Sequence, residues 1–251
     1  MQPVEAVIFD WGGTLTPWHT VDLRAQWRST YAAHAHPGDD AAAETLTEAL
    51  LAAEAHMWGL GREQHQHRSA RLADVLRHAI HASGLDGETL HTPQVSAAYE
   101  DFWEPHTWTD PQVLPLWSWL RGQGLGVGVL SNTLWSRDYH RGIFARDGVL
   151  DLIDGDVYSS EIDVVKPHAD AFRAVAAAVG VPPQRCVYVG DRIYEDVHGP
   201  QQVGMRAVHI PHSDIPASQH VAVEATPDAV AHQLADIAGI VRGWQVEASG
   251  G

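Results

Sequence analysis

The chain has 251 residues, 45% of them hydrophobic, which fits a globular protein and excludes the disordered and fibrous classes. Its 16 basic residues stand against 32 acidic ones, and the net charge of −16 makes nucleic acid and anionic membrane surfaces poor partners. An anionic substrate would therefore have to be held by a metal ion or by a few well-placed cations.

The first residues lack the basic region and the long apolar run of a signal peptide, and no apolar run reaches the roughly eighteen residues that a membrane span needs. We therefore expect a cytoplasmic protein that does not enter a membrane. The single cysteine, Cys186, lies in an apolar run and is expected to pack in a strand.

The first predicted element is a buried strand from Val4 to Phe9, which is mostly apolar. Ligands in an open α/β sheet bind beyond the carboxyl ends of the strands, so Asp10 is a candidate nucleophile. The two glycines after Trp11 would let the backbone approach a ligand closely. Taken alone, an aspartate at a strand end is as often a helix cap or a turn residue.

The pattern then becomes helical and stays so to about residue 106. Apolar residues recur at helical spacing between Leu46 and Met57 and again between Leu72 and Ile80. Two further helices are predicted from Asp22 to His34 and from Pro93 to Trp103. We expect these elements to form a compact four-helix module, separated by breaks that contain glycine.

Strands and helices alternate in the rest of the chain. Strands are predicted at Gly126 to Leu130, Asp156 to Ser159, Cys186 to Val189 and Arg206 to Ile210. A last helix is expected to carry the apolar stripe Val230, Leu234, Ile237 and Val241. Repeated strand–helix units predict a parallel sheet with helices on both faces, and therefore an α/β fold.

Polar residues fall at the ends of the predicted strands: Asp10, Ser131, Lys166 just after the third strand, and Asp191 with Asp196 five residues on. Parallel strands bring all their carboxyl ends to one edge of the sheet. Two carboxylates there can hold Mg²⁺ through oxygen. The hydroxyl of Ser131 and the ammonium of Lys166, the only lysine in the chain, would bind the oxygens of a transferring group. The pattern predicts a phosphoryl-transfer site.

At these residues the chain resembles the haloacid dehalogenase-like hydrolase superfamily. The family's motifs appear in order as Phe9-Asp10-Trp11-Gly12-Gly13-Thr14-Leu15, Leu130-Ser131-Asn132, Val165-Lys166-Pro167 with Phe172 downstream, and Val189-Gly190-Asp191 through Asp196. Each motif is weak by itself, but four in this order and context are a strong signal. The resemblance implies a Rossmann-like catalytic core of residues 1–17 and 107–251, with a helical cap of residues 18–106 inserted after the first motif.

The resemblance also implies roles for individual residues. Asp10 would form an aspartyl intermediate, and Mg²⁺ would be bound by Asp10, the backbone carbonyl of Gly12 and Asp191, with Asp196 orienting the metal's surroundings. The residues expected to contact the substrate are Trp11, Gly12, Ser131, Asn132 and Lys166.

One position departs from the phosphatase pattern of the family. Phosphatases of this family carry a second aspartate two residues after the nucleophile, and this chain has Gly12 there. That aspartate acts as the general acid and base, a function worth roughly 10²–10⁴ in rate. Either another residue supplies this function or the leaving group needs little protonation. The metal would use only the backbone carbonyl at this position, so the site should still bind Mg²⁺.

Three branches of the superfamily also lack this aspartate. Phosphonatases need a lysine in the cap, but the single lysine here belongs to the core. The 2-haloacid dehalogenases carry a tyrosine at position 12 and work without metal, whereas Asp191 and Asp196 favour metal binding. The cation pumps require membrane spans, and this chain has none of the required length.

His19 follows the first motif closely and is a candidate for the missing acid and base. Glu195 and His198 are weaker candidates, which would otherwise face solvent. Ten of the 17 histidines lie between His19 and His106. Their scattered spacing favours solvated helix positions over a metal cluster.

We therefore predict a Mg²⁺-dependent hydrolase, a phosphatase that acts on a small phosphorylated metabolite through an aspartyl intermediate. Two alternatives stay open: a 2-haloacid dehalogenase-like hydrolase, and a degenerate member that binds a phosphorylated ligand without turnover. No nucleic-acid or membrane partner is expected, and the chain would be a monomer or a homodimer.

Overall fold

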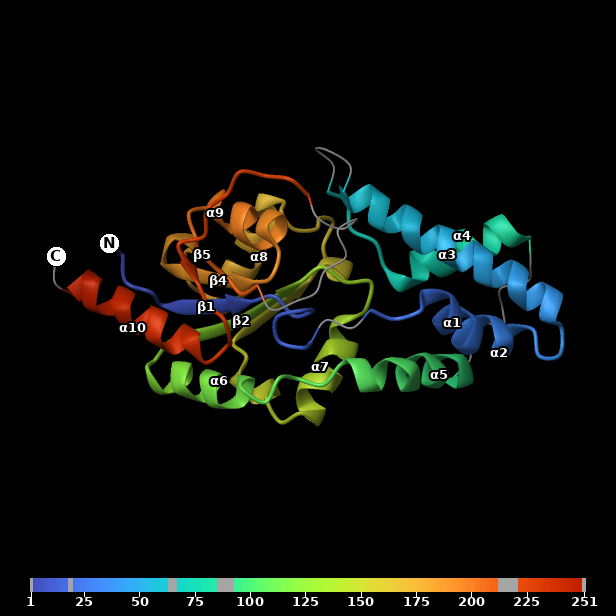
Figure 1. The fold of residues 1–251 in the computed structure, drawn as a ribbon, viewed down its shortest axis with the longest axis horizontal. Helices are drawn as coiled ribbons and strands as arrows, with labels where there is room; N and C mark the ends of the chain where they lie inside the picture. Colours follow the sequence, from blue (N-terminus) through green and yellow to red (C-terminus); the bar gives the residue numbers. More distant parts are fainter. Residues whose placement is uncertain (1, 18–19, 63–66, 85–92, 212–220, 250–251) are drawn as a thin grey trace. The chain divides into compact units, whose positions relative to one another are not determined.

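The computed structural model describes residues 2–17, 20–62, 67–84, 93–211 and 221–249. It divides into two compact units, Met1–Trp18 with Trp108–Gly251, and His19–Thr107. The first unit contains the sheet and the second is helical (Figure 1). The assignment of the first unit as catalytic core and of the second as cap stays a prediction.

The sheet of the first unit has six parallel strands in the order β3-β2-β1-β4-β5-β6. Their bounds are Ala6–Phe9 for β1, Gly126–Ser131 for β2, Gly155–Tyr158 for β3, Cys186–Gly190 for β4, Arg206–His209 for β5 and Ala229–Val230 for β6. The predicted α/β class and the parallel sheet are confirmed. Each predicted strand is present, with its ends at most three residues from those expected, because apolar runs bounded by glycine and polar residues mark buried strands well.

Helices cover both faces of the sheet (Figure 1). The bounds are Val113–Gly122 for α6, Arg137–Arg146 for α7, Ala169–Val179 for α8, Gly199–Gln201 for α9 and Asp236–Ser249 for α10. Side chains alternate along each strand, so Phe9 and Val189 pack with α6, α7 and α10, whereas Ile8 and Tyr188 pack with α8 on the other face.

The end of the chain differs from the prediction. Val230 lies in β6 and is 47% exposed, and Leu234 is buried but precedes α10. Of the predicted stripe, Ile237 and Val241 are in the helix and are buried. A two-residue edge strand is too short to leave an apolar pattern, and its identity depends on pairing with β5.

The helical unit is built from α1 (Leu23–Trp27), η1 (Arg28–Ala32), α2 (Ala33–Ala35), α3 (Asp40–Arg62), α4 (Leu72–Ser83), α5 (Pro93–Trp103) and η3 (Glu104–His106). The predicted long helices are present, but the one expected from Asp22 to His34 widens into a π-helix over η1. Within it, the Thr30 hydroxyl donates to the carbonyl of Gln26, 2.8 Å away. This bond competes with the regular backbone pattern and accompanies the distortion.

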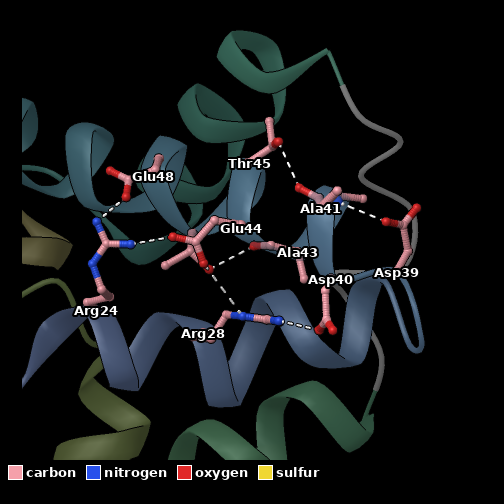
Figure 2. A network of polar contacts seen from close by, with 11 residues as sticks. Arg24, Arg28, Asp39, Asp40, Ala41, Ala43, Glu44, Thr45 and Glu48 are labelled. Carbon is pink, nitrogen blue, oxygen red and sulfur yellow. Dashed lines mark hydrogen bonds and ion pairs between the residues drawn. The ribbon is translucent and has the colours of Figure 1, made fainter.

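Acidic residues of α3 pair with arginines of α1 and η1. Arg24 contacts Glu44 and Glu48, and Arg28 contacts Asp40 (Figure 2). These groups are largely exposed, so each pair contributes little to stability. The main contribution comes from the buried side chains beneath them, which include Trp27 at 1% exposure and Leu46 and Leu50 on α3.

Among the described residues, no helix is long and apolar enough to cross a membrane. The buried thiol of Cys186 lies in β4, as expected, and burial raises its pKa to about 12.

Candidate active site

Three predicted site residues lie at the ends of adjacent strands. Asp10 directly follows β1, Ser131 ends β2 and Asp191 directly follows β4, and β1 lies between the other two. The backbone of Asp10 continues the ladder, since its N–H donates to the carbonyl of Val189 over 2.9 Å. Asp10, Ser131 and Asp191 are at most 5% exposed. The sheet order therefore brings sequence-distant groups to one edge, as expected for parallel strands.

Lys166 joins this group from the segment before α8. Its Nζ lies 2.7 Å from Oδ1 of Asp10 and 2.7 Å from Oδ1 of Asp196. The three side chains are at most 8% exposed. A charge in such a buried position is stable only when it is paired and hydrogen-bonded, and here one cation faces two carboxylates.

Asn132 holds the backbone of Lys166. The side-chain amide of Asn132 donates to the carbonyl of Lys166 over 3.1 Å, and its oxygen accepts from the N–H of Lys166 over 2.8 Å. Both ends of the amide are thus engaged with one peptide segment. In this arrangement Asn132 positions Lys166, and direct contact between Asn132 and a substrate stays a prediction.

Asp10, Asp191 and Asp196 form a cluster in which one carboxylate oxygen from each lies within 4.8 Å of the others. All three residues are buried. Several carboxylate oxygens at this separation are a suitable donor set for a hard cation such as Mg²⁺. The described residues contain no other group of three or more histidine, cysteine or acidic side chains at this spacing.

The position of Asp196 depends on the turn that follows β4. This turn, η7 (Ile193–His198), is a π-helix, and Oδ2 of Asp196 accepts from the N–H of Arg192 over 3.0 Å. Gly190 makes room for it, since a Cβ at Gly190 would lie 2.4 Å from the Cβ and Cγ of Asp196. The absence of a side chain at this glycine therefore allows the carboxylate to pack against the strand end.

Burial and the neighbouring opposite charges shift the pKa values of Asp10 and Lys166 in opposite directions. Burial raises the pKa of Asp10 to about 7, although the ammonium of Lys166 favours the carboxylate. The pKa of Lys166 is raised well above its usual value, because the attraction of Asp10 and Asp196 outweighs the effect of burial. Lys166 is therefore a permanent cation at this edge of the sheet.

The loop after Asp10 is tight. The N–H groups of Leu15 and Thr16 both donate to the carbonyl of Trp11, and Gly13 adopts the left-handed region with φ of 82°. Gly12 does not have a positive φ, and among the described residues nothing lies within 4 Å of a Cβ built on it. The described part of the sheet unit therefore leaves space for a side chain at this position, which carries none.

The indole of Trp11 packs into an aromatic cluster of the sheet unit. Its ring centroid lies 5.5 Å from that of Trp135 and 4.7 Å from that of His140, and the residue is 8% exposed. Its packing accounts for most of its surface, and a contact with substrate stays a prediction.

Three residues are candidates for the general acid and base that Gly12 does not supply: His19, Glu195 and His198. His19 lies outside the described residues. Glu195 and His198 are on η7 and are half-buried, and burial raises the pKa of Glu195. The ring of His198 stacks on Tyr194 with centroids 5.8 Å apart.

Sequence reasoning missed Tyr188. Its hydroxyl lies 2.9 Å from Nζ of Lys166 and donates to the carbonyl of Leu130 over 2.9 Å. The apolar run Cys186-Val187-Tyr188-Val189 by itself indicates only a buried strand. The phenol of Tyr188, two residues before the motif glycine, indicates a polar contact at this strand end, because a buried tyrosine hydroxyl usually has a hydrogen-bond partner.

A parallel sheet of this order, with an aspartate after its first strand and a lysine–carboxylate cluster at the same edge, is the architecture of a Rossmann-like α/β protein with a polar site at the carboxyl ends of its strands. The haloacid dehalogenase-like hydrolase family model matches residues 4–204, and the chain belongs to this family. The resemblance identified from the motifs is thereby confirmed.

Comparison with known proteins agrees with this assignment. A glyceraldehyde 3-phosphate phosphatase of Methanopyrus kandleri is 32% identical over 127 residues, which are 51% of this chain and 54% of that protein. The matched region thus spans about half of the relative's length.

Two solved structures have the same fold. A haloacid dehalogenase-family phosphatase of Thermococcus onnurineus aligns with a TM-score of 0.62 at 22% identity, covering 96% of this chain and 99% of that one. A 2-haloacid dehalogenase of Pseudomonas syringae pv. Tomato DC3000 aligns with a TM-score of 0.65, also at 22% identity and with the same coverage. The fold is therefore common to both chemistries and does not choose between them.

Proposed function

We propose that this protein is a Mg²⁺-dependent phosphatase that hydrolyses a small phosphorylated metabolite through an aspartyl intermediate on Asp10. The observation that carries the proposal is the buried cluster in which Lys166 contacts Asp10 and Asp196 while Asp191 completes a set of three carboxylates. Such a cluster combines a nucleophile, a fixed cation and oxygen ligands for a hard metal.

In the proposed reaction, a carboxylate oxygen of Asp10 attacks the phosphorus atom, and the bond from phosphorus to the leaving oxygen breaks with its electron pair. Water then hydrolyses the aspartyl phosphate and restores the carboxylate. Lys166 and the hydroxyl of Ser131 would bind the phosphoryl oxygens as negative charge redistributes over them. Asp10, Asp191 and the carbonyl of Gly12 would hold Mg²⁺, with Asp196 orienting its surroundings, and the bound metal would neutralise charge on the phosphoryl group.

Gly12 restricts the substrate class. The residue that protonates the leaving oxygen in family phosphatases is absent, so we infer a preference for leaving groups that depart without a proton, such as acyl or aryl phosphates. Supply of the proton by His19 stays a prediction. The curated relative named as a glyceraldehyde 3-phosphate phosphatase supports a small phosphorylated substrate, without identifying it.

The test is a panel of acyl, aryl and alkyl phosphates assayed with and without Mg²⁺, beside the Asp10→Asn variant. We expect Mg²⁺-dependent phosphate release that Asp10→Asn abolishes. Adding 2-haloacids to the panel tests the dehalogenase alternative. Halide release without metal would overturn the proposal, and binding of phosphate without turnover of any compound would favour a degenerate member of the family.

A further inference from the structure

Tyr188 lies in the middle of β4, and its side chain is on the face of the sheet that packs with α8. By strand alternation, Cys186 and Gly190 at the two ends of β4 are on the same face. The side chain of Tyr188 is fully buried. The ring meets Phe172 of α8 edge-on, with centroids 5.2 Å apart at 81°. A phenylalanine ring would pack against Phe172 equally well, so this packing does not account for the hydroxyl of Tyr188. A buried hydroxyl is unfavourable unless it has hydrogen-bond partners.

The hydroxyl of Tyr188 forms two bonds of opposite direction. It donates its single proton to the carbonyl of Leu130, 2.9 Å away. A lone pair of the same oxygen then accepts from Nζ of Lys166, also 2.9 Å away. Since a carbonyl can only accept and an ammonium can only donate, the direction of both bonds is determined.

This contact completes the hydrogen bonding of Lys166. An ammonium group has three N–H donors. In this structure they are directed at Asp10, Asp196 and Tyr188, over 2.7, 2.7 and 2.9 Å. The two carboxylates attract the charge, and the neutral hydroxyl accepts the third N–H, so that all three donors of the ammonium are engaged and its position is held from three sides.

The second hydrogen bond of the Tyr188 hydroxyl reaches the backbone next to Ser131. Leu130, whose carbonyl accepts from Tyr188, immediately precedes Ser131 at the end of β2. Tyr188 therefore connects β2 and β4 across the intervening β1, and it connects the backbone before Ser131 with the head of Lys166.

We propose that Tyr188 is a positioning residue that fixes the head group of Lys166 relative to Ser131 for binding of the transferring group. The expected effect of Tyr188 on catalysis rests on the proposed function. The hydrogen bond between Tyr188 and Lys166 can be tested without it. Tyr188 touches no reacting atom itself and acts through Lys166.

The first experiment compares Tyr188→Phe with Tyr158→Phe in the Mg²⁺-loaded protein. Tyr158 is also fully buried in the sheet, but its ring stacks on His140 and its hydroxyl is not one of the three acceptors of Lys166. We expect Tyr188→Phe to lower kcat about tenfold, below the 10²–10³ of a donor that contacts the reacting group directly. KM should change less than about twofold, because the loss concerns the transition state. Tyr158→Phe should keep the kcat of the wild type.

The second experiment needs no activity. Urea unfolding without Mg²⁺ is measured for Tyr188→Phe and Tyr158→Phe, each in the wild-type and in the Lys166→Met background. If the bond exists, Tyr188→Phe is more destabilising when Lys166 is present than when it is absent, whereas the effect of Tyr158→Phe is the same in both backgrounds.

The outcomes separate the two claims. An active wild type whose kcat is unchanged by Tyr188→Phe overturns the positioning role, even if the variant is less stable. Equal destabilisation by Tyr188→Phe in both Lys166 backgrounds overturns the bond itself. A wild type that hydrolyses no phosphate contradicts the proposed function and with it the catalytic part of this inference, while non-additive unfolding still supports the bond.

Discussion

At the scale of single residues, Gly12 occupies the position at which the proposed function would need a general acid and base. Its backbone does not adopt the left-handed region, whereas that of Gly13 does, with φ of 82°. Within the described ranges of the chain, nothing lies within 4 Å of a Cβ at position 12. Neither backbone strain nor a clash with a described residue therefore requires glycine here.

The Gly12→Asp variant is expected to fold normally and to raise kcat on alkyl phosphates more than on acyl or aryl phosphates. Only an alkoxide leaving group needs the proton that the new carboxyl can supply. The gain should be at most about 10²-fold, the low end of general acid catalysis, because the surroundings do not tune the new group.

Gly142→Asp is the matched control, since Gly142 is an exposed glycine of α7 with open space around it. It adds the same charge away from the strand ends and should leave the ratio of the two rates unchanged. If Gly12→Asp binds Mg²⁺ but changes that ratio no more than the control does, the link between position 12 and leaving group is wrong.

At the scale of elements, the site depends on the close approach of η7 to the end of β4. The carboxylate of Asp196 packs where a side chain at Gly190 would be, at 2.4 Å from the expected Cβ. The backbone N–H of Arg192 and the ammonium of Lys166 hold its two oxygens. A change in the strand end would therefore move a carboxylate of the cluster without altering any charge.

The Gly190→Ala variant should be less stable by about 1–3 kcal/mol, as expected when a methyl group is forced into a packed site. It should also bind Mg²⁺ more weakly, because Asp196 must move. Calorimetric titration with Mg²⁺ and urea unfolding measure the two effects. Gly239→Ala on the exposed face of α10, where nothing lies within 4 Å, should instead stabilise the protein by about 0.5–1 kcal/mol. Unchanged Mg²⁺ affinity in Gly190→Ala would contradict this account of the turn.

A second element-scale feature is the contact between α7 and the loop after β2. His140 of α7 is fully buried, and its Nε2 lies 3.1 Å from the hydroxyl of Thr133. Its ring stacks on Tyr158 with centroids 4.4 Å apart and meets Trp11 edge-on. Burial lowers the pKa of His140 to about 3, although the nearby carboxylate of Asp156 favours the charged form.

This burial predicts a pH dependence of stability. Because the pKa of His140 is lower in the folded state, unfolding binds a proton below pH 6.5, and stability is lost as the pH falls from 6.5 toward 3. Between pH 7 and pH 5 the loss from this group is about 2 kcal/mol. The raised pKa of Asp10 acts in the opposite direction, so the wild type alone does not isolate the effect.

The comparison with His140→Phe isolates it, because the variant keeps a flat ring and cannot titrate. The variant should lose about 2 kcal/mol less than the wild type between pH 7 and pH 5, as measured by urea unfolding. A stability difference between the two proteins that is the same at both pH values would show that His140 is not held neutral by burial.

At the scale of the whole molecule, a chain with a net charge of −16 concentrates three buried carboxylates at one edge of its sheet with a single ammonium among them. Like charges at this distance repel, so the cluster favours either proton uptake or a bound cation. Binding of Mg²⁺ to the folded state alone would then stabilise the whole sheet unit.

Mg²⁺ at 100 times its dissociation constant is expected to raise the free energy of unfolding by about 2.7 kcal/mol, with a rise in Tm of several degrees. Asp191→Asn should remove most of this response, because it removes one charged ligand. Asp138→Asn changes the net charge equally at an exposed site on α7 and should keep the response. Both melts are run against NaCl of matched ionic strength. A wild type with no response to Mg²⁺ would favour the metal-independent dehalogenase alternative.

From the sequence alone the α/β class and the strands could be predicted, because hydrophobic periodicity and turn residues act over short distances along the chain, and the four motifs identified the family. Once a parallel sheet is expected, the position of Asp10, Ser131 and Asp191 at one edge follows from strand direction alone. The tertiary structure decided the contacts among them. Lys166 meets Asp10 across 156 positions of sequence, and the third acceptor of its ammonium, Tyr188, lies in a strand that reads as purely structural. Such contacts depend on strand order and on the close approach of η7 to Gly190, and no local pattern encodes either.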